Sequence, residues 1–235
     1  MIIVLNNKSN LSKDEFLEYQ EQLKDISSIH NLVLCPTLLN INLFNLNNFN
    51  LGAQNVSCYD DGQYTGEVSA RDLYDSNVRY TIVGHSERRK YQKETNEEIN
   101  KKIKKLIEND IKPILCIGET KEERDSNKVE EVIKTEILEA TKNIAKEDVE
   151  KIIIAYEPIW SIGTGVIPTI EEIDNVNNMI KSILPRNIIL YGGSANEKNV
   201  DILNESSTIA GFLLGGLSLK PEEFKIFIEK LKSVN

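Results

Sequence analysis

The sequence has few of the residues that bind metals or form disulfides. Among 235 residues there are two histidines and three cysteines, Cys35, Cys58 and Cys116, which are odd in number and widely spaced. Because no CxxC pair occurs and the histidines lie far apart, neither a zinc site nor a redox pair is indicated. Two of the cysteines lie in apolar runs, where a thiol behaves as a small hydrophobic side chain. We therefore expect a reduced, cytoplasmic setting and no metal.

Long apolar runs and an excess of positive charge are also missing. The apolar run at residues 2–5 is too short for the core of a signal peptide, and no run approaches the length of a membrane span. The chain has 28 basic and 37 acidic side chains, a net charge of −9. This balance argues against a nucleic-acid binder and against docking on anionic membranes. An anionic substrate would have to be attracted by a few local groups.

The chain alternates short apolar runs with longer amphipathic segments. Most of the short runs are apolar at successive positions, which is typical of parallel strands covered on both faces. The predicted strands are 2–5, 32–35, 50–55, 80–84, 113–118, 152–156, 187–192 and 209–215. Helical spacing of apolar residues predicts helices within 13–26, 96–110, 129–144, 170–184 and 222–231. In the first of these helices, Phe16, Leu17, Tyr19, Leu23 and Ile26 are expected on one face.

The order of strands and helices predicts an α/β protein with an eightfold (β/α)8 barrel, a closed parallel sheet ringed by helices. Eight units in 235 residues leave about 29 residues for each, near the lower end of what such a barrel needs. No linker or shift in composition divides the chain, so we expect a single barrel domain over residues 1–235. A doubly wound open sheet is the alternative, although no GxGxxG follows the first strand, where a dinucleotide-binding fold would have one.

Glycine is sparse, and its placement is therefore informative. Half of the 12 glycines form three pairs that follow the last three predicted strands: Gly163 and Gly165, Gly192 and Gly193, and Gly215 and Gly216. Each pair alone could form a tight turn. Three pairs at the same end of consecutive strands favour anion binding, because backbone amides after the last barrel strands form the phosphate site of many barrels.

Three ionisable residues follow predicted strands at the same end: Lys8, His85 and Glu157. Each has an ordinary alternative, as a surface cation, a structural histidine or a strand terminus. Together they supply a cation, an electrophile and a base that face one anion site. That set suits proton abstraction next to a carbonyl on a phosphorylated substrate. We interpret the other histidine, His30, as structural, because it precedes its strand at the opposite end.

Motifs along the whole chain resemble the triosephosphate isomerase family. They are NNK at 6–8, GAQN at 52–55, YTGEVSA at 64–70, IVGHSERR at 82–89, ILCIGE at 114–119, AYEPIWSIGTG at 155–165, YGGS at 191–194 and LLGGLSL at 213–219. The resemblance implies a TIM barrel, no cofactor and a homodimer. It also implies interconversion of glyceraldehyde 3-phosphate and dihydroxyacetone phosphate through an enediolate, in glycolysis and gluconeogenesis.

The resemblance also assigns roles to single residues. Glu157 would be the base and His85 a neutral electrophile, an assignment established for this family and carried over here. Lys8 would stabilise the enediolate, with Asn6 hydrogen-bonded to the substrate beside it. Backbone amides would hold the phosphate, and the residues concerned are Gly163, Ser194, Gly215 and Gly216. Glu87 and Cys116 would lie close to the site.

Two further segments are assigned by the resemblance. Residues 158–168 would form a closing lid, in which the named positions are Pro158, Ile159, Trp160, Gly163, Thr164, Gly165 and Pro168. In the loop 56–66, Thr65 would reach into a neighbouring subunit, where Arg88 would help to receive it. The sequence departs from the common family pattern at Asn7, where many members have an aromatic residue, and at residues 166–168 of the lid. The second strand–helix unit is short and is expected to hold only a short helix.

Two other functions compete with this interpretation. A different phosphate-binding barrel, acting on a sugar phosphate, would explain the glycine pairs, but the combination of Lys8, His85 and Glu157 argues against it. A non-catalytic binding protein would keep the barrel and the dimer. Loss of the base would indicate it, whereas Glu157 is present.

Overall fold

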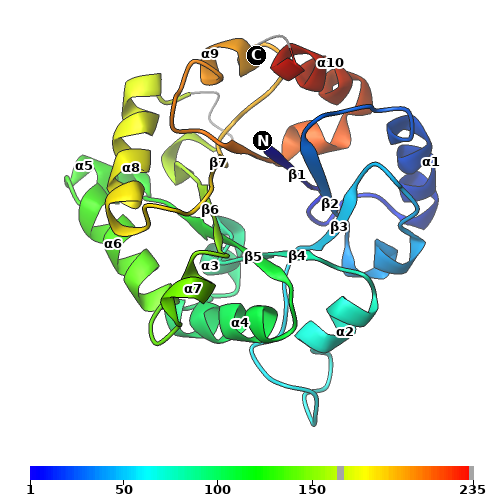
Figure 1. Cartoon of the computed structure of the whole chain (residues 1–235), viewed down its shortest axis with the longest axis horizontal. Coiled ribbons are helices and arrows are strands. Elements are labelled where there is room, and N and C mark those ends of the chain that lie inside the picture. Colours follow the sequence, from blue (N-terminus) through cyan, green and yellow to red (C-terminus); the bar gives the residue numbers. More distant parts are fainter. Residues whose placement is uncertain (163–166, 233–235) are drawn as a thin grey trace.

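A computed structural model of the chain describes residues 1–162 and 167–232. Eight parallel strands close a barrel in chain order, with β1 paired to both β2 and β8 (Figure 1). The strands are β1 (Ile2–Asn6), β2 (Asn31–Cys35), β3 (Asn50–Ala53), β4 (Tyr80–Val83), β5 (Lys112–Ile117), β6 (Ile153–Tyr156), β7 (Ile189–Tyr191) and β8 (Gly211–Leu214). The predicted (β/α)8 barrel is confirmed, and each predicted strand overlaps an observed one.

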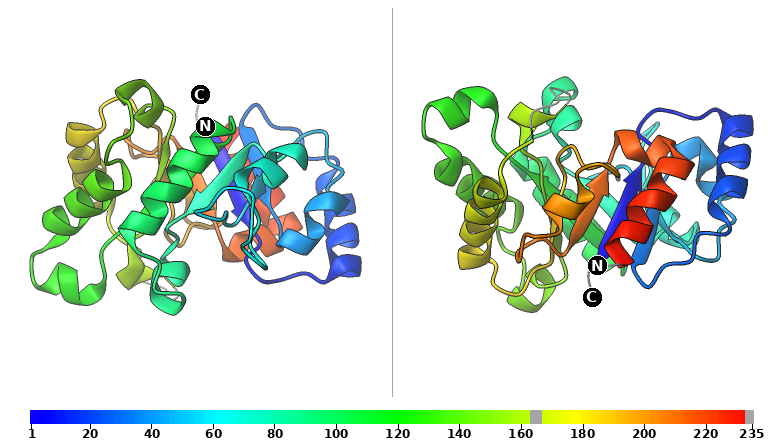
Figure 2. Two further views of the ribbon diagram at one scale, coloured as in Figure 1. Left: turned by 90° about the horizontal axis from the view of Figure 1, so that it is seen from below. Right: turned by 90° about the horizontal axis from the view of Figure 1, so that it is seen from above.

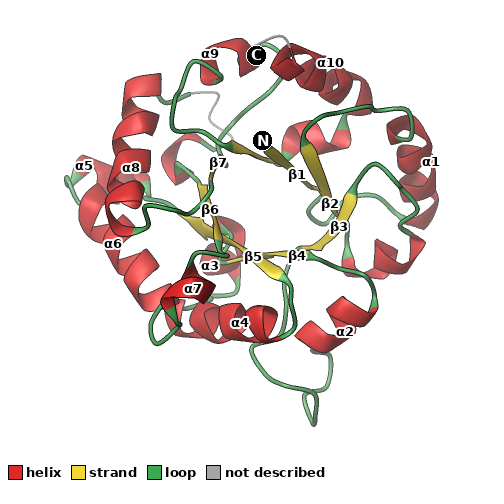
Figure 3. Ribbon diagram, in the orientation of Figure 1, coloured by secondary structure: helices red, strands yellow, loops and turns green. Residues whose placement is uncertain are grey.

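Helices surround the barrel on all sides (Figure 3). The five longest are α1 (Lys13–Leu23), α4 (Asn96–Glu108), α6 (Val129–Ala140), α8 (Ile170–Ile183) and α10 (Pro221–Lys232). Five short ones are α2 (Ala70–Asp75), α3 (Ser86–Tyr91), α5 (Lys121–Asp125), α7 (Lys146–Val149) and α9 (Val200–Leu203). Within residues 1–162 and 167–232, three 3-10 turns complete the ring: η1 (Leu38–Leu43), η2 (Ile159–Ser161) and η3 (Gly216–Leu219). The second unit has only η1 between β2 and β3, which agrees with its predicted shortening.

The strands are buried on both faces, which explains their continuous apolar sequences. In β1, Val4 points into the barrel, where it packs with residues such as Ile82 and Leu213. Its neighbours Ile3 and Leu5 pack outward against the helices. Side views show α6 and α8 on one side of the barrel and α1 on the other (Figure 2). Apolar area removed from water on both faces of the sheet stabilises this arrangement.

Helix α4 shows how the sequence sets the limits and orientation of a helix. The Thr95 side chain accepts a hydrogen bond from the amide of Glu98, and the Glu98 carboxylate accepts one from the amide of Thr95, which forms a capping box. Its apolar face, Ile99, Ile103 and Leu106, is fully buried.

Within the described ranges, none of the helices combines the length and apolarity that a membrane crossing requires.

One predicted core position in α1 is wrong. Phe16, Tyr19 and Leu23 are buried as expected, but the Leu17 side chain is 40% exposed. Successive residues of a helix are rotated by about 100°, which turns Leu17 away from the face on which Phe16 lies.

Candidate active site

The carboxyl ends of the strands surround a cavity of about 440 Å³. Three side chains predicted from the sequence, Lys8, His85 and Glu157, line it together. They follow β1, β4 and β6, and a parallel barrel brings the ends of its strands to one face. The other lining residues are Asn6, Ile162, Gly192, Gly193, Ser194, Ala195, Asn196, Leu213, Gly215, Gly216, Leu217, Lys220 and Glu223.

Glu157 is a buried carboxylate held by two donors. The residue is only 2% exposed. Its Oε2 accepts a hydrogen bond from the backbone amide of Ser86 at 3.0 Å, and its Oε1 lies 3.1 Å from Nε2 of His85. The amide of Glu157 donates to the carbonyl of Ile117 at 2.8 Å, which fixes the backbone against the end of β5. Burial thus separates this carboxylate from bulk water, and both of its oxygen atoms have a donor.

His85 caps the short helix α3, and this contact sets its protonation. Its Nδ1 accepts a hydrogen bond from the amide of Glu87 at 3.2 Å, so Nδ1 bears no proton. The hydrogen-bond network therefore assigns the ring proton to Nε2, the nitrogen that faces Glu157. The ring is ready to donate from Nε2 to an oxygen atom that enters the cavity.

Lys8 adopts a strained backbone that the surrounding residues hold in place. Its φ angle is 52°, in the left-handed region that residues other than glycine seldom adopt. The Lys8 amide donates to Oδ1 of Asn6 at 3.0 Å, and the Lys8 carbonyl accepts from Nε2 of Gln54 at 2.7 Å. The ammonium group donates to Oε1 of Glu87 at 2.6 Å. These contacts hold the backbone and the ammonium group of Lys8 beside the cavity that it lines.

The glycine-rich end of the cavity lies beside Lys8. A Cβ atom at Gly215 would approach Cε of Lys8 to 3.2 Å, whereas a Cβ at Gly216 would meet nothing within 4 Å. Gly216 begins η3, whose Ser218 hydroxyl donates to the carbonyl of Asn6 at 2.9 Å. The residue between Asn6 and Lys8, Asn7, is buried and its Nδ2 donates to the carbonyl of Ser218 at 3.3 Å. The loop after β1 and the turn after β8 are thus joined by hydrogen bonds.

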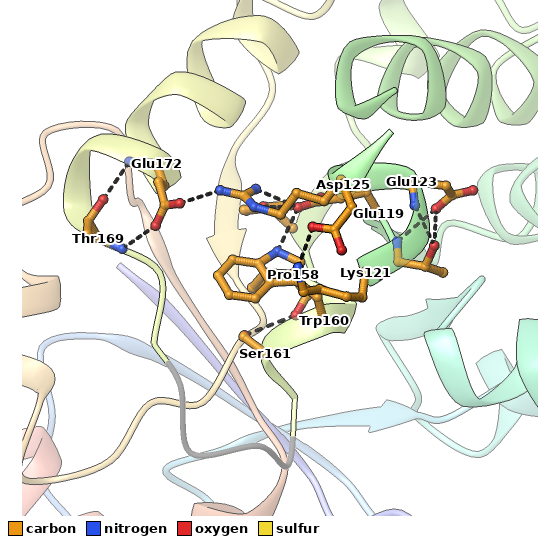
Figure 4. Close-up of polar contacts among 12 residues, drawn as sticks. Glu119, Lys121, Glu123, Asp125, Pro158, Trp160, Ser161, Thr169 and Glu172 are labelled. Atoms are coloured by element: carbon orange, nitrogen blue, oxygen red, sulfur yellow. Dashed lines mark hydrogen bonds and ion pairs between the residues drawn. The ribbon is translucent and has the colours of Figure 1, made fainter. Parts of the chain in front are cut away.

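The first part of the expected lid is anchored on a buried carboxylate. Glu119 accepts hydrogen bonds at Oε1 from the indole of Trp160 at 2.8 Å and from the Tyr156 hydroxyl at 3.1 Å, and it pairs with Arg124 at 3.0 Å (Figure 4). Pro158 precedes η2, which contains Ile159 and Trp160.

The remaining lid positions fall partly outside the described residues. Gly163, Thr164 and Gly165 lie outside them, and with them the phosphate contact predicted for the Gly163 amide. Pro168 is buried just before α8. In the first turn of α8, Glu172 accepts from the amide of Thr169 at 2.8 Å (Figure 4).

The remaining predicted residues lie beside the cavity or away from it. Cys116 is fully buried in β5, and burial raises the pKa of its thiol well above the ordinary value. Arg88 donates from Nε to Glu94 at 3.2 Å and lines a second cavity, of about 420 Å³, that also contacts Asn6, Lys8 and His85. Thr65 is exposed on the loop between β3 and α2, which extends away from the barrel (Figure 1), and it does not line the first cavity.

Several residues that hold the site were not predicted. Gln54 and Glu119 belong to the motifs GAQN and ILCIGE, but the motifs did not indicate that these side chains hold Lys8 and Trp160. Ser86 contributes only its backbone amide, for which a side-chain pattern gives no signal. Ser218 acts through its contact with Asn6, which lies 212 positions earlier in the chain. Only the fold brings η3 beside the end of β1.

The similarity of this sequence to known proteins extends over nearly the whole chain. A sequence model of the family described as triosephosphate isomerase matches residues 1–231. The chain belongs to the triosephosphate isomerase family. It is therefore an isomerase that interconverts the aldose and ketose forms of a triose phosphate, glyceraldehyde 3-phosphate and dihydroxyacetone phosphate, in glycolysis and gluconeogenesis.

Curated relatives named triosephosphate isomerase match most of the chain. One from Alkaliphilus oremlandii is 43% identical, over 95% of this chain and 96% of its own length. One from Dictyoglomus turgidum is 39% identical over the same shares. One from Francisella tularensis subsp. mediasiatica is 40% identical over 78% of this chain and 76% of its own. The expected family and activity are confirmed, while the roles of single residues stay predictions.

Proposed function

We propose that Glu157 moves the proton between the two carbon atoms of the substrate while His85 donates to its oxygen atoms. The observation that supports this most directly is the contact of 3.1 Å between Glu157 Oε1 and His85 Nε2 at the edge of the cavity. A substrate carbonyl that enters between them would accept the Nε2 proton. Oε1 would then be free to take a proton from the adjacent carbon.

We propose that Lys8 and the glycine-rich turns form the phosphate subsite. Lys8 carries the charge, and Asn6 beside it donates a hydrogen bond to the substrate. Ser194, Gly215 and Gly216 present backbone to the same cavity, where amides can approach an anion closely. Because the whole chain bears a charge of −9, this local arrangement would have to supply the attraction for a phosphorylated substrate.

We propose that residues 158–168 close over the bound substrate. The hydrogen bond from Trp160 to Glu119 would hold the first part of the lid away from the cavity, and closure would exchange it for contacts near the phosphate. Exclusion of water would strengthen the base and would protect an enediolate that can otherwise lose its phosphate group.

We propose that two copies of the chain form a homodimer in which Thr65 of each enters the second cavity of the other. That cavity shares Asn6, Lys8 and His85 with the catalytic one. Its rim includes Leu38, which is 52% exposed in the single chain.

The burial of Cys35 and Cys116 as free thiols supports a reducing, cytoplasmic setting.

The assignment of the base is tested by Glu157→Gln in a coupled isomerisation assay, with no metal or cofactor added. Because only the proton acceptor is lost, we expect turnover to fall by about 10²–10⁴ while KM changes little. Glu223→Gln is the matched control, since it removes the charge of another carboxylate on the cavity. Near-normal turnover in Glu157→Gln would contradict the assignment.

The dimer is tested by sedimentation of Thr65→Arg, which places a long cation in the proposed interface. We expect a shift toward monomer and a loss of activity that depends on protein concentration. Asn178→Arg is the control, because Asn178 is exposed on α8 and the change in charge is the same. A Thr65→Arg protein that still sediments as a dimer would argue against this docking mode.

A further inference from the structure

A half-buried arginine in α3, Arg89, contacts the ends of two neighbouring strands. From Nε, Arg89 donates to the carbonyl of Gly84 at 2.8 Å, just after β4. From Nη2 it donates to the carbonyl of Cys116 in β5 at 3.3 Å. From Nη1 it donates to Oδ1 of Asn96 at 2.6 Å, and the same nitrogen lies 3.3 Å from Oε1 of Glu136. The planar guanidinium group can make these contacts together because its donors have a fixed fork geometry.

Glu136 completes this arrangement from the far side of β5. It lies on the inner face of α6, and only 12% of its side chain is exposed. While Oε1 pairs with Arg89, Oε2 accepts a hydrogen bond from the backbone amide of Gly118 at 2.9 Å. One carboxylate thus connects α3 to the first residue after β5.

The backbone atoms held by this pair belong to the immediate neighbours of the catalytic residues. Gly84 directly precedes His85 and has a φ of 69°, so the direction of the chain into His85 is set at this residue. Gly118 lies against the backbone of Glu157, since a Cβ atom there would fall 1.7 Å from the Glu157 carbonyl oxygen. The two catalytic side chains come from β4 and β6, and the pair reaches both through β5 and α3.

We propose that Arg89 and Glu136 are a positioning pair that fixes the placement of His85 relative to Glu157. The proposal rests on the function proposed above for these two residues. It explains why a largely buried ion pair occupies a place whose volume apolar side chains could fill. An apolar pair could fill the volume, but it would leave the Gly84 and Cys116 carbonyls and the Gly118 amide without these partners.

The proposal predicts an effect on turnover and little on substrate affinity. The proposed phosphate subsite lies on β1, β7 and β8, away from the strands that the pair holds. Loosening β4 and β5 would change the distance between base and electrophile, to which a proton transfer is sensitive. A residue needed only for folding would lower stability and leave the kcat of the folded fraction unchanged.

The test uses Arg89→Lys, Glu136→Gln and the double variant Arg89→Met with Glu136→Leu. Arg89→Lys keeps a cation beside the buried carboxylate but cannot reach three acceptors in one plane. The double variant replaces both charges by apolar side chains of similar volume, which favours recovery of stability. Ile137→Ala is the matched control, because Ile137 is fully buried on the same helix and its truncation destabilises without touching the pair.

We expect kcat to fall about tenfold or more in all three variants, while KM stays within about threefold of the wild-type value. The control should keep the wild-type kcat once the rate is corrected for the fraction of folded protein. The double variant decides between the two roles. If recovery of its thermal stability also restores kcat, the pair is structural and the proposal is overturned. A kcat of wild-type size in Arg89→Lys and Glu136→Gln would overturn it as well.

A second readout does not depend on activity. The chain has two histidines, so nitrogen NMR of labelled histidine gives one ring pattern for His85 and one for His30. We expect the variants to change the His85 pattern and to leave that of His30 in place. Unchanged His85 signals would overturn the proposal. If Glu157→Gln kept its turnover while these signals shifted, the proposed base would be wrong and the positioning role of the pair would stand.

Discussion

The close approach of Gly118 to Glu157 predicts a large effect of a single methyl group. In Gly118→Ala the new Cβ would lie 1.7 Å from the Glu157 carbonyl oxygen, whereas real Cβ contacts lie above 3.0 Å. The ends of β5 and β6 would have to separate by the difference, about 1.3 Å. Both atoms that limit the approach are fixed to the backbone, so a side-chain rotation cannot relieve the overlap.

That displacement has one consequence for stability and another for catalysis. Overpacking of this kind costs about 1–3 kcal/mol, which for a chain of this size lowers Tm by roughly 3–10 °C. A shift of about 1 Å in a catalytic group can cost on the order of 10² in rate. We therefore expect kcat to fall by about two orders of magnitude, or about 2.7 kcal/mol in the activation barrier.

Gly211→Ala provides the matched control. Its Cβ would lie 1.9 Å from the carbonyl oxygen of Ile2, at the start of β8 and β1 and therefore at the opposite end of the barrel. Thermal melts should show similar losses in both variants, while the coupled assay should show a large loss of kcat only in Gly118→Ala. If both variants melt early and both keep kcat within about threefold, the placement of the Glu157 backbone does not limit turnover.

Three further results are expected. Lys8→Ala should weaken binding of phosphoglycolate and lower turnover together, and unchanged affinity in calorimetry would argue against its role at the phosphate. Glu119→Leu removes the acceptor shared by Trp160 and Tyr156 and should destabilise by about 1–3 kcal/mol, which a denaturant melt equal to that of the wild type would contradict. Burial raises the pKa of Glu136 to about 7, so the folded state binds the proton more tightly and the wild type loses stability as the pH rises from about 4.5 toward 7. Glu136→Gln lacks this titration, so its unfolding free energy should rise relative to that of the wild type across that window, and a difference that is constant with pH would contradict this.

Much of the fold could be predicted because local patterns and global architecture agree. Continuous apolar runs such as that of β1 are buried on both faces, and the capping signal at Thr95 lies where α4 begins. The prediction was wrong at Leu17, where an apolar residue adjacent to the buried face was counted with it. Apolar character alone does not tell which way a side chain points, whereas its position within the helical period does.

The candidate site was predictable to the extent that its residues follow strands. Lys8, His85 and Glu157 could be placed together because a parallel barrel brings the ends of its strands to one face. The contacts that hold them were not predictable. Gln54 donates to the Lys8 carbonyl and Glu136 accepts from the Gly118 amide, and both contacts join side chains to backbone atoms across elements distant in sequence. Such contacts leave no spacing pattern in a single sequence.

The most direct test of the account follows the proton itself. Isomerisation of glyceraldehyde 3-phosphate in deuterated water, followed by proton NMR, reports whether a base on the enzyme exchanges the transferred proton with solvent. For the wild type we expect dihydroxyacetone phosphate that has acquired deuterium at the carbon which receives the proton, and for Glu157→Gln both product and exchange slower by about 10²–10⁴. If Glu157→Gln exchanged and isomerised the substrate as fast as the wild type, a different group would be the base.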